Sequence, residues 1–397
     1  MKFTFPKSPK PDSVADSDWN NWTWQLRQSL KTQSDFEKVF TLTENERAAF
    51  AQGKELFNIR TTPYYASLAG DSPQDSIRQI LMPQRFEIEE GLQQMLDPLG
   101  ERKNNPAPRV IHRYSDRVLF LVTDICSVYC RFCTRKHFTG QEQAFIRNEE
   151  YEQALSYIRS HPGIREVILS GGDPLTISDA QMDRVLSDLR NIDHVEIIRI
   201  GTRMPVVCPM RVTDELVAIL KKHKPVFLMS HFNHPNELTA EAATALEKFV
   251  DNGVPVMNQM VLLNGINNHP ALVQALNRRL LYLRVKPYYM FQCDPSQGTD
   301  HLRTSVEDSL EIQKELWGHL SGLAMPNLSV DIPNGGGKTY LVPNFQVAQE
   351  GLTRKYVGWD GVEAEYVSPA AENIKKPDAS LYLTEWESLK ASKTLRT

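Results

Sequence analysis

Short apolar segments alternate with longer amphipathic segments through the middle of this 397-residue chain, from about residue 110 onward. The apolar segments are rich in β-branched or aromatic residues and lie at 117–122, 166–170, 195–201, 226–231, 255–262 and 284–291. The segments between them have helical spacing and lie at 149–161, 178–191, 213–223, 238–252 and 269–282. Such alternation predicts an α/β fold in which helical crossovers join parallel strands.

The length of the alternating region bears on the kind of sheet. A closed eight-stranded barrel usually needs about 250 residues, whereas the six predicted strands lie between residues 117 and 291. A partial, TIM-like (β/α)6 barrel therefore fits better than a closed one. A doubly wound sheet remains the alternative. In either fold, functional residues are expected at the C-terminal ends of the strands.

The regions on either side have different patterns. Before residue 110, helical spacing is found at 18–27, 34–39, 43–57 and 73–95, with a break at 61–65. Near the C-terminus, a helix at 303–319 precedes strands at 327–332, 354–358 and 363–367. We therefore predict three regions, namely an N-terminal helical region (1–109), the partial barrel (110–295) and a C-terminal α+β extension (296–397).

Composition excludes several classes of protein. The net charge is -4, from 45 basic and 49 acidic residues, which gives no electrostatic reason to expect nucleic acid or a membrane surface. No apolar run approaches the roughly 20 residues of a membrane helix. Residues 1–18 are polar and contain prolines, unlike a signal peptide. We therefore expect a cytoplasmic protein.

Three of the five cysteines lie together, directly after the first predicted strand of the barrel. Cys126, Cys130 and Cys133 have the spacing C-x3-C-x2-C, whereas Cys208 and Cys293 stand alone. In a reducing compartment, such clustering favours a metal site over disulfides. A structural zinc usually has four protein ligands. Three thiolates instead suit a four-iron cluster with one iron open to an external ligand, which we expect here.

A glycine-rich segment lies near the C-terminus. Gly335, Gly336 and Gly337 precede Lys338, so the backbone there can approach a ligand closely. The lysine is a candidate phosphate clamp or Schiff-base lysine. The P-loop pattern fails because Ile332 stands where that pattern needs glycine. A hairpin turn with a solvated lysine is the alternative.

The cysteine loop resembles that of the radical S-adenosylmethionine enzymes, because Phe132 supplies the aromatic residue of C-x3-C-x-aromatic-C. A glycine-rich turn after the second strand, Ser170-Gly171-Gly172-Asp173, adds to the resemblance. The resemblance implies a 4Fe-4S cluster on Cys126, Cys130 and Cys133. It further implies that S-adenosyl-L-methionine chelates the open iron and that the turn receives its methionine amino group.

The whole chain resembles the lysine 2,3-aminomutase family. The matching segments are Asp18–Trp22, Thr62–Tyr65, His112–Arg117, His231–Glu237, Pro287–Tyr289 and the GGGKT loop. In that family the lysine after the glycines forms the internal aldimine with pyridoxal 5'-phosphate, a role that passes to Lys338. Arg113, Tyr114 and Arg117 match residues that hold this cofactor, chiefly its phosphate.

The resemblance also assigns the substrate residues. Arg135 matches the arginine that pairs with the substrate carboxylate, for which a guanidinium fork is well suited. Asp294 and Asp331 match two aspartates that bind the distal ammonium of lysine. A glutamate-acting relative replaces these two with cationic or neutral residues. Two carboxylates therefore favour a cationic substrate, because a buried ammonium without a partner is costly.

The implied activity is an isomerase that moves the α-amino group of L-lysine to the β-carbon through a 5'-deoxyadenosyl radical. An arginine 2,3-aminomutase and a lysine isomerase serving elongation factor modification are the alternatives. The implied partners are an amino acid substrate, an electron donor and further copies of the chain. Two departures stand out, since Asn334 replaces a fourth glycine and no cysteine follows Cys293. We therefore expect no zinc in the C-terminal region.

Overall fold

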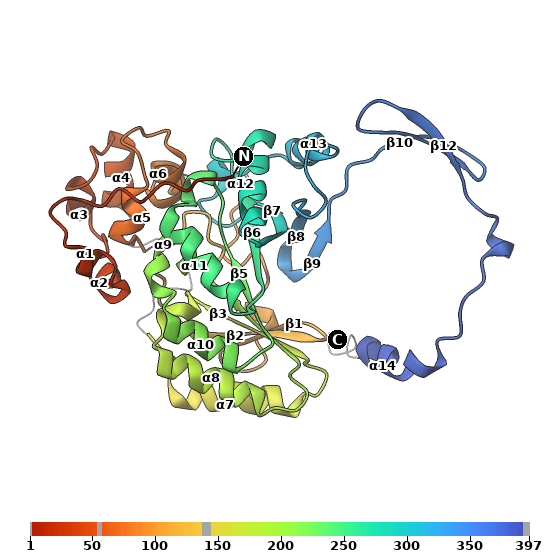
Figure 1. Ribbon diagram of the computed structural model, residues 1–397, viewed down its shortest axis with the longest axis horizontal. Helices are drawn as coiled ribbons and strands as arrows, with labels where there is room; N and C mark the ends of the chain where they lie inside the picture. The colour runs from red at the N-terminus through yellow and green to blue at the C-terminus, as the bar shows by residue number, and fades with distance from the viewer. Residues whose placement is uncertain (1, 54–57, 90, 137–143, 392–397) are drawn as a thin grey trace.

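The computed structural model of the chain describes residues 2–53, 58–89, 91–136 and 144–391 (Figure 1). One sheet of nine strands forms its centre, with the strands in sequential order from β1 to β9. The bounds are β1 Val110–Tyr114, β2 Arg117–Thr123, β3 Glu166–Gly171, β4 Ile197–Gly201, β5 Val226–Ser230, β6 Val256–Leu262, β7 Lys286–Gln292, β8 Asn327–Ile332 and β9 Gly337–Tyr340.

The strand order decides between the two predicted kinds of sheet. Strands β2 to β8 run parallel, each beside the next in the chain, while β1 and β9 pair antiparallel at the two edges. A doubly wound sheet would reverse its strand order at a switch point, and this sheet does not. Among the described residues β1 and β9 do not pair, so the barrel is incomplete. The predicted partial barrel is confirmed, and the doubly wound alternative is wrong.

Helices cover the outer face of the sheet (Figure 1). The longer ones are α7 Asn148–Ser160, α8 Asp179–Arg190, α10 Asp214–Lys222, α11 Ala240–Asp251, α12 Pro270–Tyr282 and α13 Val306–Leu316. In α7 the buried side chains are Tyr151, Ala154, Leu155 and Ile158, which share one helical face. They meet the outward side of the strands, where Val167 and Leu169 of β3 are fully buried. The alternate residues of each strand therefore point into the barrel.

Six short helices form most of the N-terminal region, namely α1 Asp16–Trp19, α2 Trp22–Arg27, α3 Gln33–Glu37, α4 Glu44–Gln52, α5 Pro63–Ser67 and α6 Ser76–Leu81. The predicted helix over 73–95 is confirmed only over α6, which ends before Pro83, with Met82 already extended. Residue 90 of that range lies outside the described residues. The predicted break at 61–65 is confirmed only at Thr61 and Thr62, which are not helical. There Thr62 caps α5 and Pro63 occupies its first turn. Residues 54–57, in the helix expected at 43–57, lie outside the described residues.

The N-terminal helices are fixed to the barrel through buried hydroxyl groups. The Tyr64 hydroxyl lies 2.6 Å from that of Thr239, and the Tyr65 hydroxyl donates to Glu237 at 2.6 Å. Both tyrosines are fully buried. Hydrogen-bonded polar groups inside an interface fix its geometry, since leaving either partner unpaired would be costly. The helical region therefore has a defined position beside the ends of β2 to β5.

The predicted C-terminal extension (296–397) supplies β8 and β9 to the barrel sheet, and the chain leaves the barrel after β9 (Figure 1). Strands β10 Gln346–Glu350, β11 Thr353–Val357 and β12 Glu363–Val367 form a separate antiparallel sheet, followed by α14 Ser380–Ala391. The strands predicted near 354–358 and 363–367 correspond to β11 and β12. None of the described helices combines the length and apolar character needed to cross a membrane.

Candidate active site

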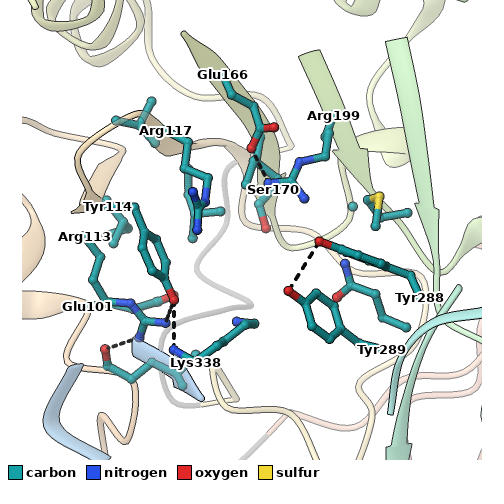
Figure 2. A pocket seen from close by; sticks show the side chains of 18 of the residues that line it. Glu101, Arg113, Tyr114, Arg117, Glu166, Ser170, Arg199, Tyr288, Tyr289 and Lys338 are labelled. Atoms are coloured by element: carbon teal, nitrogen blue, oxygen red, sulfur yellow. Dashed lines mark hydrogen bonds and ion pairs between the residues drawn. The ribbon is translucent and has the colours of Figure 1, made fainter. Parts of the chain in front are cut away.

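A cavity of about 500 Å³ occupies the inside of the barrel (Figure 2). Side chains from both edges of the sheet and from its middle strands line it. They are Leu99, Glu101, Ile111, Arg113, Tyr114, Arg117, Val118, Leu119, Arg135, Glu166, Ile168, Ser170, Arg199, Gly201, Met229, Gln259, Tyr288, Tyr289, Lys338 and Tyr340. Five of these are cationic, so the cavity is suited to anionic groups.

The cysteine loop leaves the C-terminal end of β2, and its three cysteines are free thiols. The Arg203 guanidinium donates to the Cys130 sulfur at 2.9 Å, and the backbone N–H of Arg135 donates to the Cys133 sulfur at 3.3 Å. Burial, and next the neighbouring cysteines, raise the pKa of the Cys126 and Cys133 thiols. The three cysteines would therefore need a cationic centre beside them to be held together as thiolates.

Arg203 itself is held by groups from two distant segments. It forms an ion pair with Glu237 at 2.6 Å, and the same guanidinium nitrogen donates to the Tyr65 hydroxyl at 2.8 Å. These two contacts fix the orientation of the guanidinium. Both Arg203 and Glu237 are buried. Arg203 thus connects the N-terminal helices with the cysteine loop, through the sulfur of Cys130.

The glycine-rich turn after β3 packs directly on the cysteine loop. Gly171 has a φ of +124°, and a Cβ atom added to it would lie 2.2 Å from the Thr123 carbonyl oxygen. A Cβ on Gly172 would lie 2.2 Å from the carbonyl oxygen of Ile125. Only glycine permits this approach, which the Gly172 N–H strengthens by donating to Thr123 O at 2.7 Å.

The two polar residues of this turn face different surroundings. The Asp173 carboxylate is buried and accepts hydrogen bonds from the Thr202 hydroxyl at 2.6 Å and the Arg203 N–H at 2.7 Å. Burial raises the pKa of Asp173. Ser170 instead lines the cavity, where its hydroxyl accepts a hydrogen bond from Arg135 at 2.7 Å. Asp173 thus orders the turn from behind, and Ser170 belongs to the cavity wall.

Arg135 extends from the cysteine loop into the cavity and is held by Glu101. Its Nη2 and Nε atoms donate to the Glu101 carboxylate at 2.6 Å and 2.8 Å, as a guanidinium fork does. Although burial opposes the charge, Glu101 outweighs it and raises the pKa of Arg135. Glu101 comes from the region before the barrel and was not among the predicted site residues.

Lys338 is the second residue of β9 and lies beside two residues of β1 (Figure 2). Its backbone N–H donates to the Tyr114 hydroxyl at 3.0 Å, and its ammonium lies 3.1 Å from Asp331. Arg113 donates to the same Asp331 carboxylate at 2.8 Å and to the Tyr114 hydroxyl at 3.0 Å. These side-chain contacts join the two edges of the sheet, β1 and β9, which are not paired by backbone hydrogen bonds among the described residues.

Tyr114 is surrounded by cations. Burial alone would raise the pKa of Tyr114, but the Lys338 N–H and the Arg113 guanidinium outweigh it and lower the value. The Arg117 guanidinium lies 3.9 Å from the centre of the Tyr114 ring, within the range of a cation–π contact. Arg117 also donates to Asp116 at 2.7 Å. The three predicted cofactor residues of β1 and β2 therefore lie together, beside Lys338.

Asn334 stands where the glycine loop was expected to differ. Its φ is +60°, a left-handed conformation that asparagine tolerates better than most residues. Its N–H donates to the Pro98 carbonyl oxygen at 2.9 Å. Asn334 therefore adopts the conformation that a glycine would supply, and β9 begins three residues later.

Two family models match the sequence. Residues 120–273 match the model described as Radical SAM superfamily, and residues 313–393 match the one described as Lysine-2,3-aminomutase. The L-lysine 2,3-aminomutase of Clostridium subterminale is 44% identical over 357 residues, which cover 90% of this chain and 86% of the relative. The chain belongs to the lysine 2,3-aminomutase family. It is an isomerase of the radical SAM superfamily.

Other members of the lysine 2,3-aminomutase family are similarly close. The L-lysine 2,3-aminomutase of Bacillus subtilis is 44% identical over 370 residues, covering 93% of this chain and 78% of the relative. The Glutamate 2,3-aminomutase of Clostridioides difficile is 41% identical over 362 residues, covering 91% and 86%. Overall identity therefore does not distinguish a lysine-acting enzyme from a glutamate-acting one. The distinction depends on the side chains of the site.

The cysteine loop of this family member fits an iron–sulfur cluster. Among the described residues, no three His, Cys, Asp or Glu side chains surround one point as a single metal ion requires. A four-iron cluster needs no such convergence, because each thiolate binds a different iron. The donors to the Cys130 and Cys133 sulfurs are of the kind that tune such clusters.

A smaller cavity of about 240 Å³ adjoins the two predicted substrate carboxylates of this aminomutase family member. Asp294 and Asp331 both line it. Burial, and next the Asp331 carboxylate, raise the pKa of Asp294 to about 7. The predicted aspartates thus lie together, although Asp331 is already paired with Arg113 and Lys338.

Proposed function

We propose that the chain moves the α-amino group of L-lysine to the β-carbon, with a 4Fe-4S cluster, S-adenosyl-L-methionine and pyridoxal 5'-phosphate as cofactors. One observation carries the proposal. The Lys338 amine and the Arg135 guanidinium, from distant parts of the chain, line the same cavity beside the cysteine loop. A radical source, an amine that binds aldehydes and an amino acid substrate can therefore meet in one cavity.

Cys126, Cys130 and Cys133 would hold the cluster, and the turn from Ser170 to Asp173 would hold the methionine amino group. The cluster and S-adenosyl-L-methionine supply a carbon radical strong enough to remove a hydrogen atom that no base can remove. The contacts of Arg203 and Asp173 keep the loop and the turn in fixed positions. A radical reaction needs the groups around it to be held in fixed positions in this way.

Lys338 would hold pyridoxal 5'-phosphate, with Arg113, Tyr114 and Arg117 around its phosphate and ring. When bound, this cofactor supplies a π-system through which nitrogen can pass between adjacent carbons. The residues present fit it, because Arg113 and Arg117 place two guanidinium groups beside the lysine. The Tyr114 hydroxyl fixes the Lys338 backbone and thereby the origin of its side chain.

The substrate would lie between Arg135 and the aspartate pair. Arg135 suits the substrate carboxylate, because Glu101 and Ser170 hold its guanidinium in the cavity wall. Asp294 and Asp331 suit a distal ammonium, since two adjacent buried carboxylates without a cation are unfavourable. Asp331 now neutralises Lys338, and the ammonium of lysine would take that place when Lys338 is bound to the cofactor.

We further propose that an external electron donor reduces the cluster and that the protein forms a homo-oligomer. Exposed apolar side chains of the C-terminal extension, such as Val362 and Tyr366 at 62% and 61% exposure, support the second point. Size-exclusion chromatography with light scattering tests it, and a monomer at micromolar concentration would contradict it.

The reaction is tested by anaerobic incubation of the reconstituted protein with S-adenosyl-L-methionine, a strong reductant, and lysine, arginine or glutamate separately. We expect the β-amino isomer from lysine and little or none from glutamate. Product from arginine in excess of lysine would change the substrate within the same reaction class. Product from glutamate but not lysine would refute the role given to Asp294 and Asp331.

A further inference from the structure

An ion pair between Arg199 and Glu166 lies on the inner wall of the barrel (Figure 2). Glu166 begins β3, Arg199 lies in the middle of β4, and both side chains line the large cavity. The Arg199 side chain is 17% exposed and that of Glu166 is 23% exposed, so the pair is largely removed from bulk water. The proposed function gives neither residue a role.

The position of Glu166 matters because of its neighbour on β2. Strands β2 and β3 pair in parallel, and Arg117 and Glu166 are directly opposite each other in that register. Opposite residues on adjacent strands are about 5 Å apart at their backbones, so their side chains reach each other easily. Glu166 nevertheless pairs with Arg199, while Arg117 lies over the Tyr114 ring and bonds Asp116.

A carboxylate in this position works against binding of a phosphate. A phosphate monoester carries a charge of about -1.5 to -2 at neutral pH. An uncompensated Glu166 would repel it, and would also attract Arg117 away from it. At the separations found within one cavity, such a charge changes affinity by about tenfold or more. Arg199 removes this penalty by neutralising Glu166.

We propose that Arg199 is a positioning residue for the cofactor phosphate, acting by holding Glu166 away from Arg117. The inference rests on the proposed function, which places the phosphate at Arg113 and Arg117.

The test is a binding titration rather than an assay of turnover. The dissociation constants of pyridoxal 5'-phosphate and of pyridoxal, which lacks the phosphate, are measured by absorption without S-adenosyl-L-methionine or substrate. We expect Arg199→Gln to weaken binding of the phosphorylated form by about tenfold or more, and that of pyridoxal by less than about twofold. Glu166→Gln should bind the phosphorylated form at least as tightly as the parent protein. The double variant should also return to the parent affinity.

Arg165→Gln is the matched control, because Arg165, next to Glu166 in the chain, pairs with Glu196 and is not among the residues that line the cavity. It should leave both dissociation constants unchanged. Circular dichroism checks that each variant is folded. If Arg199→Gln does not fold, the result for Glu166→Gln still tests the inference.

Four results would overturn the inference. They are equal weakening of both ligands by Arg199→Gln, no weakening of either ligand by Arg199→Gln, a double variant as weak as Arg199→Gln alone, and weakened binding by Glu166→Gln. A parent protein that binds pyridoxal 5'-phosphate together with an Arg199→Gln variant that binds it equally well overturns this inference only. A parent protein that does not bind the cofactor at all overturns the proposed function as well.

Discussion

Asp331 and Lys338 are paired residues of the antiparallel ladder between β8 and β9, with carboxylate and ammonium 3.1 Å apart. Their spacing of seven residues along the chain is thus the length of a hairpin that returns the lysine beside the aspartate. Arg113 reaches the same carboxylate from β1 at 2.8 Å. The candidate cofactor lysine and the candidate substrate aspartate therefore share one charge network.

Replacing the lysine tests the first half of this network. We expect Lys338→Ala to abolish the visible absorption band of protein-bound pyridoxal 5'-phosphate, because the amine that binds the aldehyde is removed. Lys314→Ala, on the exposed side of α13, is the control and should retain the band. A band of parent intensity in Lys338→Ala would place the cofactor on another lysine.

The raised pKa of Asp294, about 7, predicts a pH dependence of lysine binding. Above that pH the carboxylate is charged and attracts the distal ammonium, whereas below it the neutral acid does not. Lysine should therefore bind more weakly at pH 6 than at pH 8, measured through the substrate-induced change in cofactor absorption. In Asp294→Asn this part of the pH dependence should disappear. Equal affinity of the parent protein at both pH values would contradict the role of Asp294.

Arg203→Gln should destabilise the protein strongly. The substitution leaves Glu237 buried without its cation, and breaking a buried pair in this way costs about 3–5 kcal/mol. Thermal denaturation should show a clear drop in melting temperature. Arg184→Gln breaks an exposed pair with Glu152, worth about 0–1 kcal/mol, and should change it little. Similar melting temperatures for the two variants would show that the Arg203 pair adds little to stability.

Gly171→Ala should disturb the cysteine loop. The added Cβ would meet the Thr123 carbonyl oxygen at 2.2 Å, and the φ of +124° is unfavourable for alanine. Strain of this kind costs about 1–3 kcal/mol even without the clash. We expect less iron bound after reconstitution and a lower melting temperature. Gly322→Ala, where an added Cβ meets nothing within 4 Å, should keep both values.

Much of the barrel could be predicted because periodicity is a local property. The six predicted strands agree with β2 to β7 within a few residues at each end. Strand β1 was not predicted, since three of its five residues are polar or partly polar: Arg113 and Tyr114 line the cavity, and His112 bonds Tyr157 of α7. The helix predicted over 73–95 ends early because Pro83 stops it.

The candidate site likewise contains residues that could be predicted from the sequence and residues that could not. Motif residues such as Cys130 and Lys338 could be found from spacing and resemblance. Glu101 and Arg203 could not, because their meaning depends on partners 34 and 73 residues away, at Arg135 and Cys130. A lone glutamate before the barrel, or a lone arginine after β4, has no local pattern that separates it from an ordinary surface charge.

The incomplete closure of the sheet has a consequence for where new chemistry can be added. A barrel closed by backbone hydrogen bonds would use its last two edges on each other. Here β1 and β9 remain unpaired with each other, and Tyr114 and Lys338 meet across the opening through a side chain. The parallel strands alone carry the cysteine loop and its glycine turn. The seam between the two edge strands is therefore the part of the architecture where a second cofactor can be accommodated without altering the first.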